Sequence, residues 1–488
     1  MSNPIPLSGA PRGAGQFFLY SRTADDTDMR CSVVIPCHNG AELTRACITS
    51  LLEQESPPLE ILIVDNASSD DTNTLSAIAP SVRVISLPRN LGFAGGVNAG
   101  LREARGETVM IVNNDTQAAR SLTREMHTVL DSDPRIGACA PVSNHVKGDA
   151  HLAVGAFGKE PGQRQELSQA LQAEPLLQDA DTLAGLCLLV RRSTLQEIGL
   201  FDERFGHGNY EDDDFCLRLR LHGYRLAIAR RAFLHHEGHA TFEALGLNIK
   251  DQIKKRLSQF RDKWQSHPAG LATLAGIHGN YALAHNAAVT AQRQVPNWLD
   301  ADWHIGRHHE LQGDAKLAIR HLRTFLEHCP LHVEARITLA LALIRDGQLQ
   351  LGQGVIEQTM TQHRPTQKQE TQMLKRLGQL AYEAGQYKNA AVHLRTALEI
   401  TPESGELHNW LGLCELATDN LTSALKAFTN ATQQGFALGF TNLGICQSRL
   451  GQLDAAVQNF EEAVNRLPND PVVQANYQAG VAALAGSA

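Results

Sequence analysis

A repeat of about 34 residues fills the second half of the chain, and it limits the possible folds more than any other feature of the sequence. A small residue recurs once in each unit, at Gly306, Ala340, Gly378, Gly412 and Gly444. A second small residue follows twelve positions later, at Ala318, Gly352, Ala390, Ala424 and Ala456. Two helices that cross closely leave room only for Gly or Ala at the crossing point. The pattern therefore predicts stacked pairs of helices over residues 265–488, because no single pair can bury its apolar face alone.

The length of the unit and the order of its small residues resemble those of tetratricopeptide repeats. Prolines close four of the units, at Pro330, Pro365, Pro402 and Pro468. Residues 471–484 follow the last unit and are expected to form a capping helix. Arrays of this kind present concave surfaces to peptides or proteins, so a protein partner on the array is one expectation. Packing within the chain or dimerisation is the other.

Short apolar runs alternate with helical stretches in the first half of the chain. Strands are predicted at residues 32–36, 60–65, 82–85 and 108–112, with helices at residues 42–53 and from about Gly95 onward. Runs that are apolar on both faces are typical of buried parallel strands joined by helical crossovers. We therefore predict an α/β domain with a mostly parallel sheet over residues 30–249.

Two shorter segments complete the predicted organisation of the chain. Residues 1–29 lack the apolar core of a secretory signal and are expected to be a mobile extension. Residues 250–264 predict a basic amphipathic helix that carries Ile253, Leu257, Phe260 and Trp264 on one face. The favoured interpretation is a linker helix packed on the α/β domain. The alternative is contact with a membrane surface.

Composition excludes several classes of protein. The 52 acidic residues outnumber the 44 basic ones, so no general positive field exists to hold a nucleic acid. No run of 18 apolar residues is present, which argues against a membrane-spanning helix. The nine cysteines are scattered without a CxxC pair, so a reducing, cytoplasmic location is expected. No dinucleotide-binding GxGxxG follows the first strand and no phosphate-binding P-loop occurs, which disfavours an oxidoreductase.

Polar side chains follow two of the predicted strands, at the sheet edge where open α/β folds bind ligands. Asp65 ends the strand at residues 60–65, and Asn113-Asn114-Asp115 follows the strand at residues 108–112. An acid at this edge accepts hydrogen bonds from a nucleoside, or binds Mg²⁺ or Mn²⁺ with other hard oxygen ligands. The alternatives are an Asx turn and helix cap at residues 69–71 and an ordinary turn at residues 113–115.

Four consecutive acids, Glu211 to Asp214, begin a predicted helix behind a Gly-rich segment at residues 206–208. The positive end of a helix dipole offsets only part of their repulsion, and capping accounts for only one or two of them. Carboxylates clustered in this way predict a general base in a cleft. Further on, His235, His236 and His239 follow a predicted strand and are candidates for binding a metal or a phosphate.

Together, in this order and spacing, these motifs resemble the family 2 glycosyltransferases, and within that family the bacterial rhamnosyltransferase-like branch. The segments that carry the resemblance are residues 32–39, 65–72, 89–98, 113–115, 199–203 and 211–218. The resemblance covers residues 30–244. It implies a GT-A fold, a nucleotide-sugar donor, a divalent metal (Mn²⁺ or Mg²⁺) and inversion at the anomeric carbon.

The resemblance also implies roles for individual residues. The nucleotide-sugar site would comprise Pro36, Asn39, Asp65, Asn98, Asn113 and Asn114. Residues 113–115 take the place of the family's DXD metal motif, and because Asn113 replaces its first acid, Asp115 would carry more of the metal binding. His236 would be the second ligand, with His235 as the fallback. Glu211 and Asp212 match the catalytic acidic pair, with Asp212 as the base, and Asp214 is expected on the acceptor side.

The expected function is therefore inverting transfer of a sugar to a hydroxyl of a cell-surface glycan, a lipid-linked molecule or a protein. The repeats would recruit the acceptor or a partner. Membrane contact would be peripheral at most, in the cytoplasm or at the inner face of the membrane. The alternative function is an interaction scaffold that carries an inactive transferase.

Overall fold

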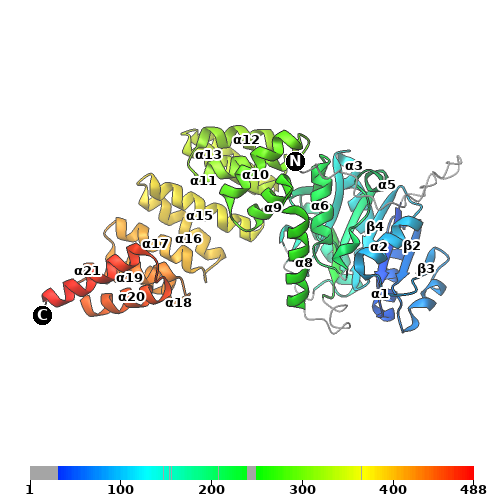
Figure 1. Ribbon diagram of the computed structural model, residues 1–488, viewed down its shortest axis with the longest axis horizontal. Helices are drawn as coiled ribbons and strands as arrows, with labels where there is room; N and C mark the ends of the chain where they lie inside the picture. The colour runs from blue at the N-terminus through cyan, green and yellow to red at the C-terminus, as the bar shows by residue number, and fades with distance from the viewer. Residues whose placement is uncertain are drawn as a thin grey trace. The chain divides into compact units, whose positions relative to one another are not determined.

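The computed structural model describes residues 31–146, 148–152, 154, 157–206, 208–238, 249–363 and 365–487. The expected extension at residues 1–29, together with His207 and His239, lies outside these described residues. The chain divides into two compact units (Figure 1). Unit 1 comprises Met1–Arg336 with Gln362–Arg364, and unit 2 comprises Ile337–Thr361 with Pro365–Ala488.

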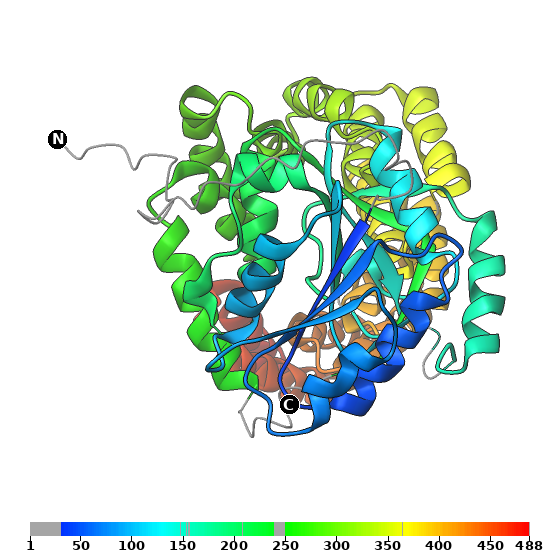
Figure 2. The ribbon, with the colours of Figure 1, turned by 90° about the vertical axis from the view of Figure 1, so that its right-hand side faces the viewer.

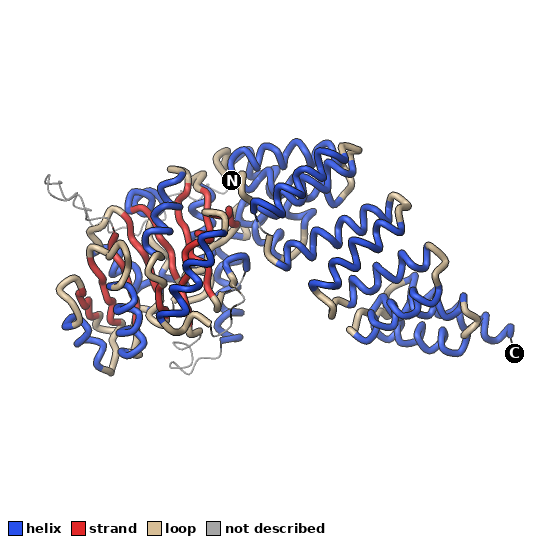
Figure 3. Tube along the Cα trace, turned by 180° about the vertical axis from the view of Figure 1, so that it is seen from behind, coloured by secondary structure: helices blue, strands red, loops and turns tan. Residues whose placement is uncertain are grey.

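Unit 1 contains a nine-stranded sheet in the order β3-β2-β1-β4-β8-β6-β9-β5, with β7 paired to β9. Its strands are β1 (Cys31–Cys37), β2 (Glu60–Asp65), β3 (Val82–Ser86), β4 (Thr108–Val112), β5 (Thr116–Ala118), β6 (Ile136–Ser143), β7 (Leu177–Ala180), β8 (Cys187–Arg191) and β9 (Arg225–His236). The four strands predicted first, β1 to β4, pair in parallel. Strand β8 runs antiparallel to β4 and β6, and β5 and β7 run antiparallel to β9, so the whole sheet is mixed. Figure 3 shows the strands in red with helices in blue around them.

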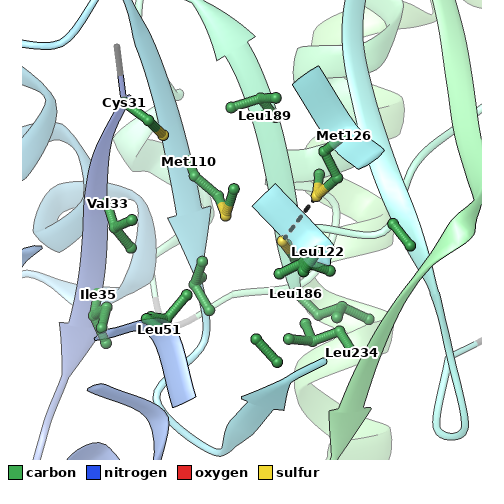
Figure 4. Close-up of a cluster of buried hydrophobic side chains, with 14 of the residues drawn as sticks. Cys31, Val33, Ile35, Leu51, Met110, Leu122, Met126, Leu186, Leu189 and Leu234 are labelled. Carbon is green, nitrogen blue, oxygen red and sulfur yellow. Dashed lines mark hydrogen bonds between the residues drawn. The ribbon is translucent and has the colours of Figure 1, made fainter. Parts of the chain in front are cut away.

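Helices cover both faces of this sheet (Figure 2). Helices α1 (Ala41–Leu52) and α3 (Leu122–Ser132) pack on one face, where alternate strand residues such as Val33 and Met110 form the core shown in Figure 4. Helices α2 (Gly92–Glu103), α5 (Arg192–Ile198) and α6 (Glu211–Leu221) pack on the other face, against the intervening residues such as Val34 and Ile111. Strands buried on both faces explain the apolar runs in the sequence, and the predicted α/β fold class is confirmed.

The order of the strands gathers the polar residues that follow them. Strands β2 and β4 flank β1 and run parallel to it, so the segments after all three leave the sheet at the same edge. This edge carries Asn39, Asp65 and residues 113–115.

Unit 1 continues beyond the sheet into helices α8 (Ile249–Trp264), α9 (Pro268–Ile277), α10 (Tyr281–Gln294), α11 (Asp300–Leu311) and α12 (Ala315–His328). Phe260 and Trp264 of α8 are buried in one cluster with Leu217 and Leu221 of α6. The amphipathic helix therefore packs on the α/β domain, as its favoured interpretation stated. The sequence divided the chain at residue 264, whereas the compact unit extends to Arg336, because the apolar side of α6 is covered by these helices.

Unit 2 is helical. Helix α13 (Val333–Arg345) crosses the boundary between the units and is followed by α14 (Leu349–Gln358) and a π-helical turn (Thr359–His363). Three further pairs and a final helix complete it: α15 (Gln367–Glu383), α16 (Tyr387–Ile400), α17 (Gly405–Ala417), α18 (Leu421–Gln433), α19 (Ala437–Arg449), α20 (Leu453–Arg466) and α21 (Pro471–Ser487). The capping helix is thus present.

The recurring glycines lie where the helices of a pair cross. A Cβ atom on Gly412 would lie 2.5 Å from the Phe428 ring, and one on Gly444 would lie 2.7 Å from the Phe460 ring. Gly378 stands in the same relation to Leu394, at 2.8 Å. The predicted reason for these small residues, close helix crossing, is confirmed.

Two further expectations concern the chain as a whole. None of the helices in the described parts of the chain has the length and apolarity that crossing a bilayer requires. All nine cysteines are buried, as small apolar core residues would be.

Candidate active site

The loops that follow β1 and β2 are joined by hydrogen bonds between the predicted nucleoside-binding residues and two serines. The backbone N–H of Asn39 donates to Ser68 Oγ at 2.8 Å, and Asn39 Oδ1 accepts from the Ser69 N–H at 2.8 Å. Asp65 Oδ1 accepts from the Ser68 N–H, also at 2.8 Å. The structure thus brings Asn39 and Asp65 together through Ser68 and Ser69.

Asp70 closes the same turn as a helix cap. Its carboxylate accepts from the Ala41 N–H at 2.9 Å and from the Thr72 N–H at 3.2 Å. Although slight burial acts in the opposite direction, the hydrogen bonds from Thr72 and Ala41 lower the pKa of Asp70. A carboxylate held ionised in this way fixes the start of α1 beside the β2 loop.

Asn66 was not predicted to belong to the site, but it organises the segment at residues 89–96. It is buried, its Nδ2 donates to the Gly92 carbonyl at 2.8 Å, and its Oδ1 accepts from the Leu91 N–H at 2.9 Å. A Cβ atom on Gly96 would lie 2.9 Å from Asn66 Nδ2 and 3.4 Å from Cβ of Pro36. Pro36 is therefore packed under α2, and a polar residue directly after Asp65 was the available signal for Asn66.

Asn98, which the resemblance assigned to the nucleotide-sugar site, is buried on α2 and uses its amide within the protein. Its side chain is 2% exposed, and Nδ2 donates to the Phe201 carbonyl and to Glu203 Oε1, both at 2.9 Å. Its Oδ1 accepts from the Phe201 N–H at 3.0 Å. Every polar atom of the amide is thus used to hold the segment at residues 201–203 on α2, so Asn98 supports the site from within.

The segment after β4 presents one partner of the expected metal pair. Asp115 is buried, and its Oδ1 lies 3.3 Å from Nε2 of His236, at the end of β9. Asn114 is buried and donates to Thr44 Oγ1 at 3.0 Å. Among the described residues, Oδ1 of Asn113 is buried and meets no hydrogen-bond donor.

The two neighbouring histidines have different surroundings. Nδ1 of His236 lies 2.8 Å from the His145 carbonyl, which leaves Nε2 directed at Asp115. Although burial opposes the charged form, Asp115 and the His145 carbonyl raise the pKa of His236. His235 is 3% exposed, and its Nε2 lies 3.7 Å from Glu237. Burial lowers the pKa of His235. The geometry thus pairs His236, and not His235, with Asp115.

The acidic run begins after a strained turn. Gly206, Gly208, Asn209 and Tyr210 all adopt positive φ angles, of 60°, 115°, 74° and 70°. Such a conformation is unfavourable for tyrosine, and strain of this kind gathers at functional sites. The turn is anchored by a 2.8 Å hydrogen bond from the Phe93 N–H to the Gly206 carbonyl.

The acids that follow have separate partners. Asp212 Oδ2 accepts from the Gly185 N–H at 2.8 Å, and Oδ1 accepts from the Asp213 N–H at 3.0 Å. Glu211 is buried, and no described group donates a hydrogen bond to its Oε2. Asp214 is fully buried and accepts from Arg218 Nε at 3.0 Å and from Trp264 Nε1 at 2.9 Å. Asp214 therefore differs from the acceptor-side position that was expected, because its carboxylate points into the contact between α6 and α8.

The pKa values of the remaining three acids are all raised. Burial, followed by the charge of Asp212, raises the pKa of Glu211 well above its usual range. Burial also raises the pKa of Asp212, while the amides of Gly185 and Asp213 oppose that rise. Burial and the neighbouring carboxylates raise the pKa of Asp213 to about 7. Burial and the neighbouring carboxylates thus disfavour the charged forms of these acids.

The loop at residues 181–186, between β7 and β8, joins these two parts of the site, and nothing in its sequence indicated this role. Gly185 donates to Asp212, and the carbonyl of the next residue, Leu186, accepts from the Asn113 N–H at 2.9 Å. Two consecutive residues therefore connect the acidic pair on α6 to the start of the 113–115 segment.

The residues present fit a divalent cation in kind. Among the described residues, no three His, Cys, Asp or Glu side chains are grouped as a metal site. Asp115 and His236 could supply two ligands, and the buried Oδ1 of Asn113 is an oxygen without a donor. Carboxylate, amide oxygen and imidazole together suit Mn²⁺ or Mg²⁺, which accept further ligands from a bound diphosphate and water.

Comparison with known proteins identifies similar families. Residues 32–199 match the family model described as glycosyl transferase family 2. N-acetylglucosaminyl-diphospho-decaprenol L-rhamnosyltransferase of Mycobacterium tuberculosis is 29% identical over 247 residues, which cover 44% of this chain and 78% of that protein. A low-salt glycan biosynthesis hexosyltransferase of Haloferax volcanii is 27% identical over 187 residues, which cover 36% of this chain and 57% of that protein.

Two solved structures are similar to this chain at lower sequence identity than these relatives. S. aureus TarS 1–349 in complex with UDP-GlcNAc has a TM-score of 0.36 and 16% identity, covering 68% of this chain and 91% of that chain. GalNAc-T7 with UDP, GalNAc and Mn²⁺ has a TM-score of 0.37 and 15% identity, covering 50% of this chain and 51% of that chain.

The second half of the chain matches models of its own. Residues 375–435 and residues 439–470 each match a tetratricopeptide repeat model. Residues 32–199 therefore lie in a family 2 glycosyltransferase domain, and residues 375–435 and 439–470 contain tetratricopeptide repeats.

Proposed function

We propose that this protein is an inverting glycosyltransferase that moves a sugar from a nucleotide-sugar donor to a hydroxyl group, with Asp212 as the general base. The observation that carries the proposal is the connection through Gly185 and Leu186, which links Asp212 to the Asn113–Asp115 segment. An inverting transfer needs a base on one side of the reacting carbon and charge stabilisation of the leaving group on the other.

Asp212 has the chemistry that the base requires. The carboxylate accepts the proton of the acceptor hydroxyl while that oxygen forms a bond to C1 of the sugar. The bond between C1 and the diphosphate oxygen breaks, and the nucleoside diphosphate leaves with the electron pair. A base is most effective when its pKa approaches the working pH, and burial raises the pKa of Asp212 in that direction. The amides of Gly185 and Asp213 orient the carboxylate.

On the donor side, Asp115, His236 and Asn113 would hold a divalent cation. A bound cation of this kind supplies positive charge to the departing diphosphate. Asn39, Asp65 and Pro36 would line the nucleoside, where the short turn at residues 65–70 already holds the loops after β1 and β2 in place.

The acceptor is proposed from the chemistry of the relatives. One is named for transfer of rhamnose to a diphospho-lipid and the other for glycan biosynthesis, which supports a glycan or lipid-linked acceptor for this chain. The repeats would then recruit that acceptor or a protein partner in glycan assembly. A protein acceptor remains the second candidate, supported by the peptide-binding habit of such arrays.

Release of nucleoside diphosphate from a panel of UDP-, GDP- and dTDP-sugars, with and without Mn²⁺, tests the proposal. We expect Asp212→Asn to lower the rate by about 10²-fold or more, the effect of losing a general base. Asp251→Asn, an exposed acid on α8, is the matched control and should retain the wild-type rate. Full activity in Asp212→Asn would refute the base assignment. Absence of both binding and release with every donor would favour the inactive scaffold.

A further inference from the structure

The loop at residues 181–186 is held at both of its ends. Its second half contacts the active site, through the Gly185 N–H to Asp212 and the Leu186 carbonyl to Asn113. Earlier in the loop, the Leu183 N–H lies 3.3 Å from Sγ of Cys216 on α6. At the other end, Asp181 of the loop and Asp179 at the end of β7 contact the segment between α12 and α13, about 150 residues further on.

That distant contact joins Asp179 and Asp181 to Leu331 and His332. Asp179 Oδ2 accepts from the Leu331 N–H at 2.8 Å, and the Asp179 N–H donates to the Leu331 carbonyl at 3.3 Å. Asp181 Oδ1 lies 2.9 Å from Nε2 of His332. Asp179 is fully buried and also binds Arg225, whereas Asp181 is half-exposed.

The hydrogen bonds of His332 define the form of its ring. Nδ1 accepts from the backbone N–H of Ala335 at 3.1 Å, as a cap at the start of α13. Because Nδ1 accepts, the ring proton must lie on Nε2, which donates it to Asp181. His332 is 3% exposed, so its ring is shielded from water, whereas the Asp181 side chain is 49% exposed. One imidazole thus caps a repeat helix and fastens the loop that reaches Asp212.

A second buried contact connects helix α6 to α11 and to the end of β7. Arg220 is 1% exposed, its Nε donates to Asp300 Oδ2 at 3.1 Å, and its Nη1 lies 3.4 Å from the Ala180 carbonyl. Arg220 therefore connects α11, the start of the loop at residues 181–186, and the helix that carries Asp212. A buried guanidinium paired in this way has little freedom to move.

We propose that His332 is a positioning residue for the glycosyl transfer, which orients Asp212 by anchoring the loop at residues 181–186. The first repeat helices are then a working part of the catalytic unit. The inference rests on the proposed function for its catalytic consequence, while the anchoring itself is independent of it.

Two substitutions at His332 separate its two bonds. His332→Asn retains an acceptor where Nδ1 lies and loses the donor to Asp181. His332→Gln retains a donor where Nε2 lies and loses the cap. Deuterium uptake of the backbone amides at residues 181–191, measured on the full chain, reports the anchoring without any substrate. We expect uptake about tenfold faster in His332→Asn and close to wild type in His332→Gln.

The catalytic consequence is read with the donor that releases nucleoside diphosphate fastest in the panel described above. In His332→Asn we expect kcat to fall about tenfold with the donor KM within twofold, and in His332→Gln a kcat within threefold of wild type. Equal uptake in His332→Asn and wild type would overturn the proposal. So would faster uptake with an unchanged kcat, or identical effects of the two substitutions.

A pair of variants at half-exposed Asp181 covers the case in which His332 variants do not fold. Asp181→Ala should reproduce the effects of His332→Asn, Asp181→Asn should retain wild-type behaviour because its amide oxygen still accepts, and the combination of Asp181→Ala with His332→Asn should add little. Additive effects would overturn the proposal. A wild-type chain inactive with every donor would refute the proposed function, while the uptake measurement still confirms or refutes the anchoring.

Discussion

The indole Nε1 of Trp264 donates a 2.9 Å hydrogen bond to Oδ1 of Asp214, two residues after Asp212. The same carboxylate accepts from Arg218 on its own helix and lies 2.5 Å from Lys263 Nζ. Helix α6 is thus fastened to α8 by a buried acid with three donors. This contact connects the helix that carries the proposed base to the helices that continue into the repeats.

The Asp214 contact predicts two different losses of stability. Trp264→Phe keeps most of the packing and removes one of three donors, so we expect a loss of about 1–2 kcal/mol. Asp214→Asn removes the acidic partner of Arg218, while Lys263 keeps its ion pair with Asp202, and should cost about 3–5 kcal/mol. Urea denaturation of the full chain measures both. A smaller loss in Asp214→Asn than in Trp264→Phe would contradict the role of the carboxylate.

The paired positions of Asp115 and His236 predict how the protein responds to Mn²⁺. His236→Gln and Asp115→Asn should each weaken Mn²⁺ binding by about 10-fold or more, because each removes a ligand. A thermal-shift titration with Mn²⁺ and UDP measures this, since a bound ligand stabilises the fold by mass action. His235→Gln is the matched control, and an equal loss in that variant would favour His235 as the ligand.

The raised pKa of Glu211 predicts that the stability of the folded chain depends on pH. Burial raises the pKa of its carboxyl in the folded chain, so the folded state binds the proton more tightly than the unfolded state. Its contribution is therefore complete below the ordinary carboxyl pKa and is lost as the pH rises toward the raised value. Glu211→Gln keeps a neutral side chain at every pH. We expect its melting temperature to exceed that of wild type by more at pH 8 than at pH 5, and the reverse order would disprove the assignment.

The close contact of Gly185 with Asp212 predicts that adding one methyl group at Gly185 lowers the rate of transfer. A Cβ atom there would lie 3.2 Å from Cβ of Asp212 and 3.4 Å from its Oδ2. Gly185→Ala should displace the carboxylate and weaken the amide hydrogen bond that lowers its pKa. We expect kcat to fall about tenfold and its acid limb to move to higher pH, in pH–rate profiles with the best donor. Gly162→Ala, with open space around the added Cβ, is the control.

The repeat glycines predict opposite effects of the same substitution. Gly412→Ala places a Cβ 2.5 Å from the Phe428 ring and should destabilise unit 2 by about 1–3 kcal/mol. Gly354→Ala, inside α14 with nothing within 4 Å, should be neutral or stabilise by about 0.5–1 kcal/mol. Denaturation followed by helical circular dichroism measures both. Similar values for the two variants would contradict close crossing as the reason for Gly412.

Patterns local in the chain predicted most of the architecture. The strands β2 and β4 lie at the residues where apolar runs predicted them, and helix α6 begins at Glu211 as its acids indicated. The spacing of Gly378, Gly412 and Gly444 predicted crossings that the structure confirms. Such features are contiguous or periodic in the chain, so they can be recognised from the sequence alone.

The sequence did not indicate the hydrogen-bond partners of the site residues, because those partners are distant in the chain. Asn98 fits the family motif, yet its amide is consumed by Phe201, 103 residues away. Asp214 belongs to the same acidic run as Asp212, but its buried carboxylate accepts a hydrogen bond from Trp264, 50 residues later. Asp181 and His332 carry no motif and meet across 151 residues.

The sequence alone thus determined the strands, the repeats and the family resemblance, because each is a periodic or contiguous pattern. Only the tertiary structure decided which donors surround each acid and how deeply it is buried. The reason is physical: a carboxylate becomes a base, a ligand or a buried anchor through the donors and burial around it, and those donors come from distant parts of the chain.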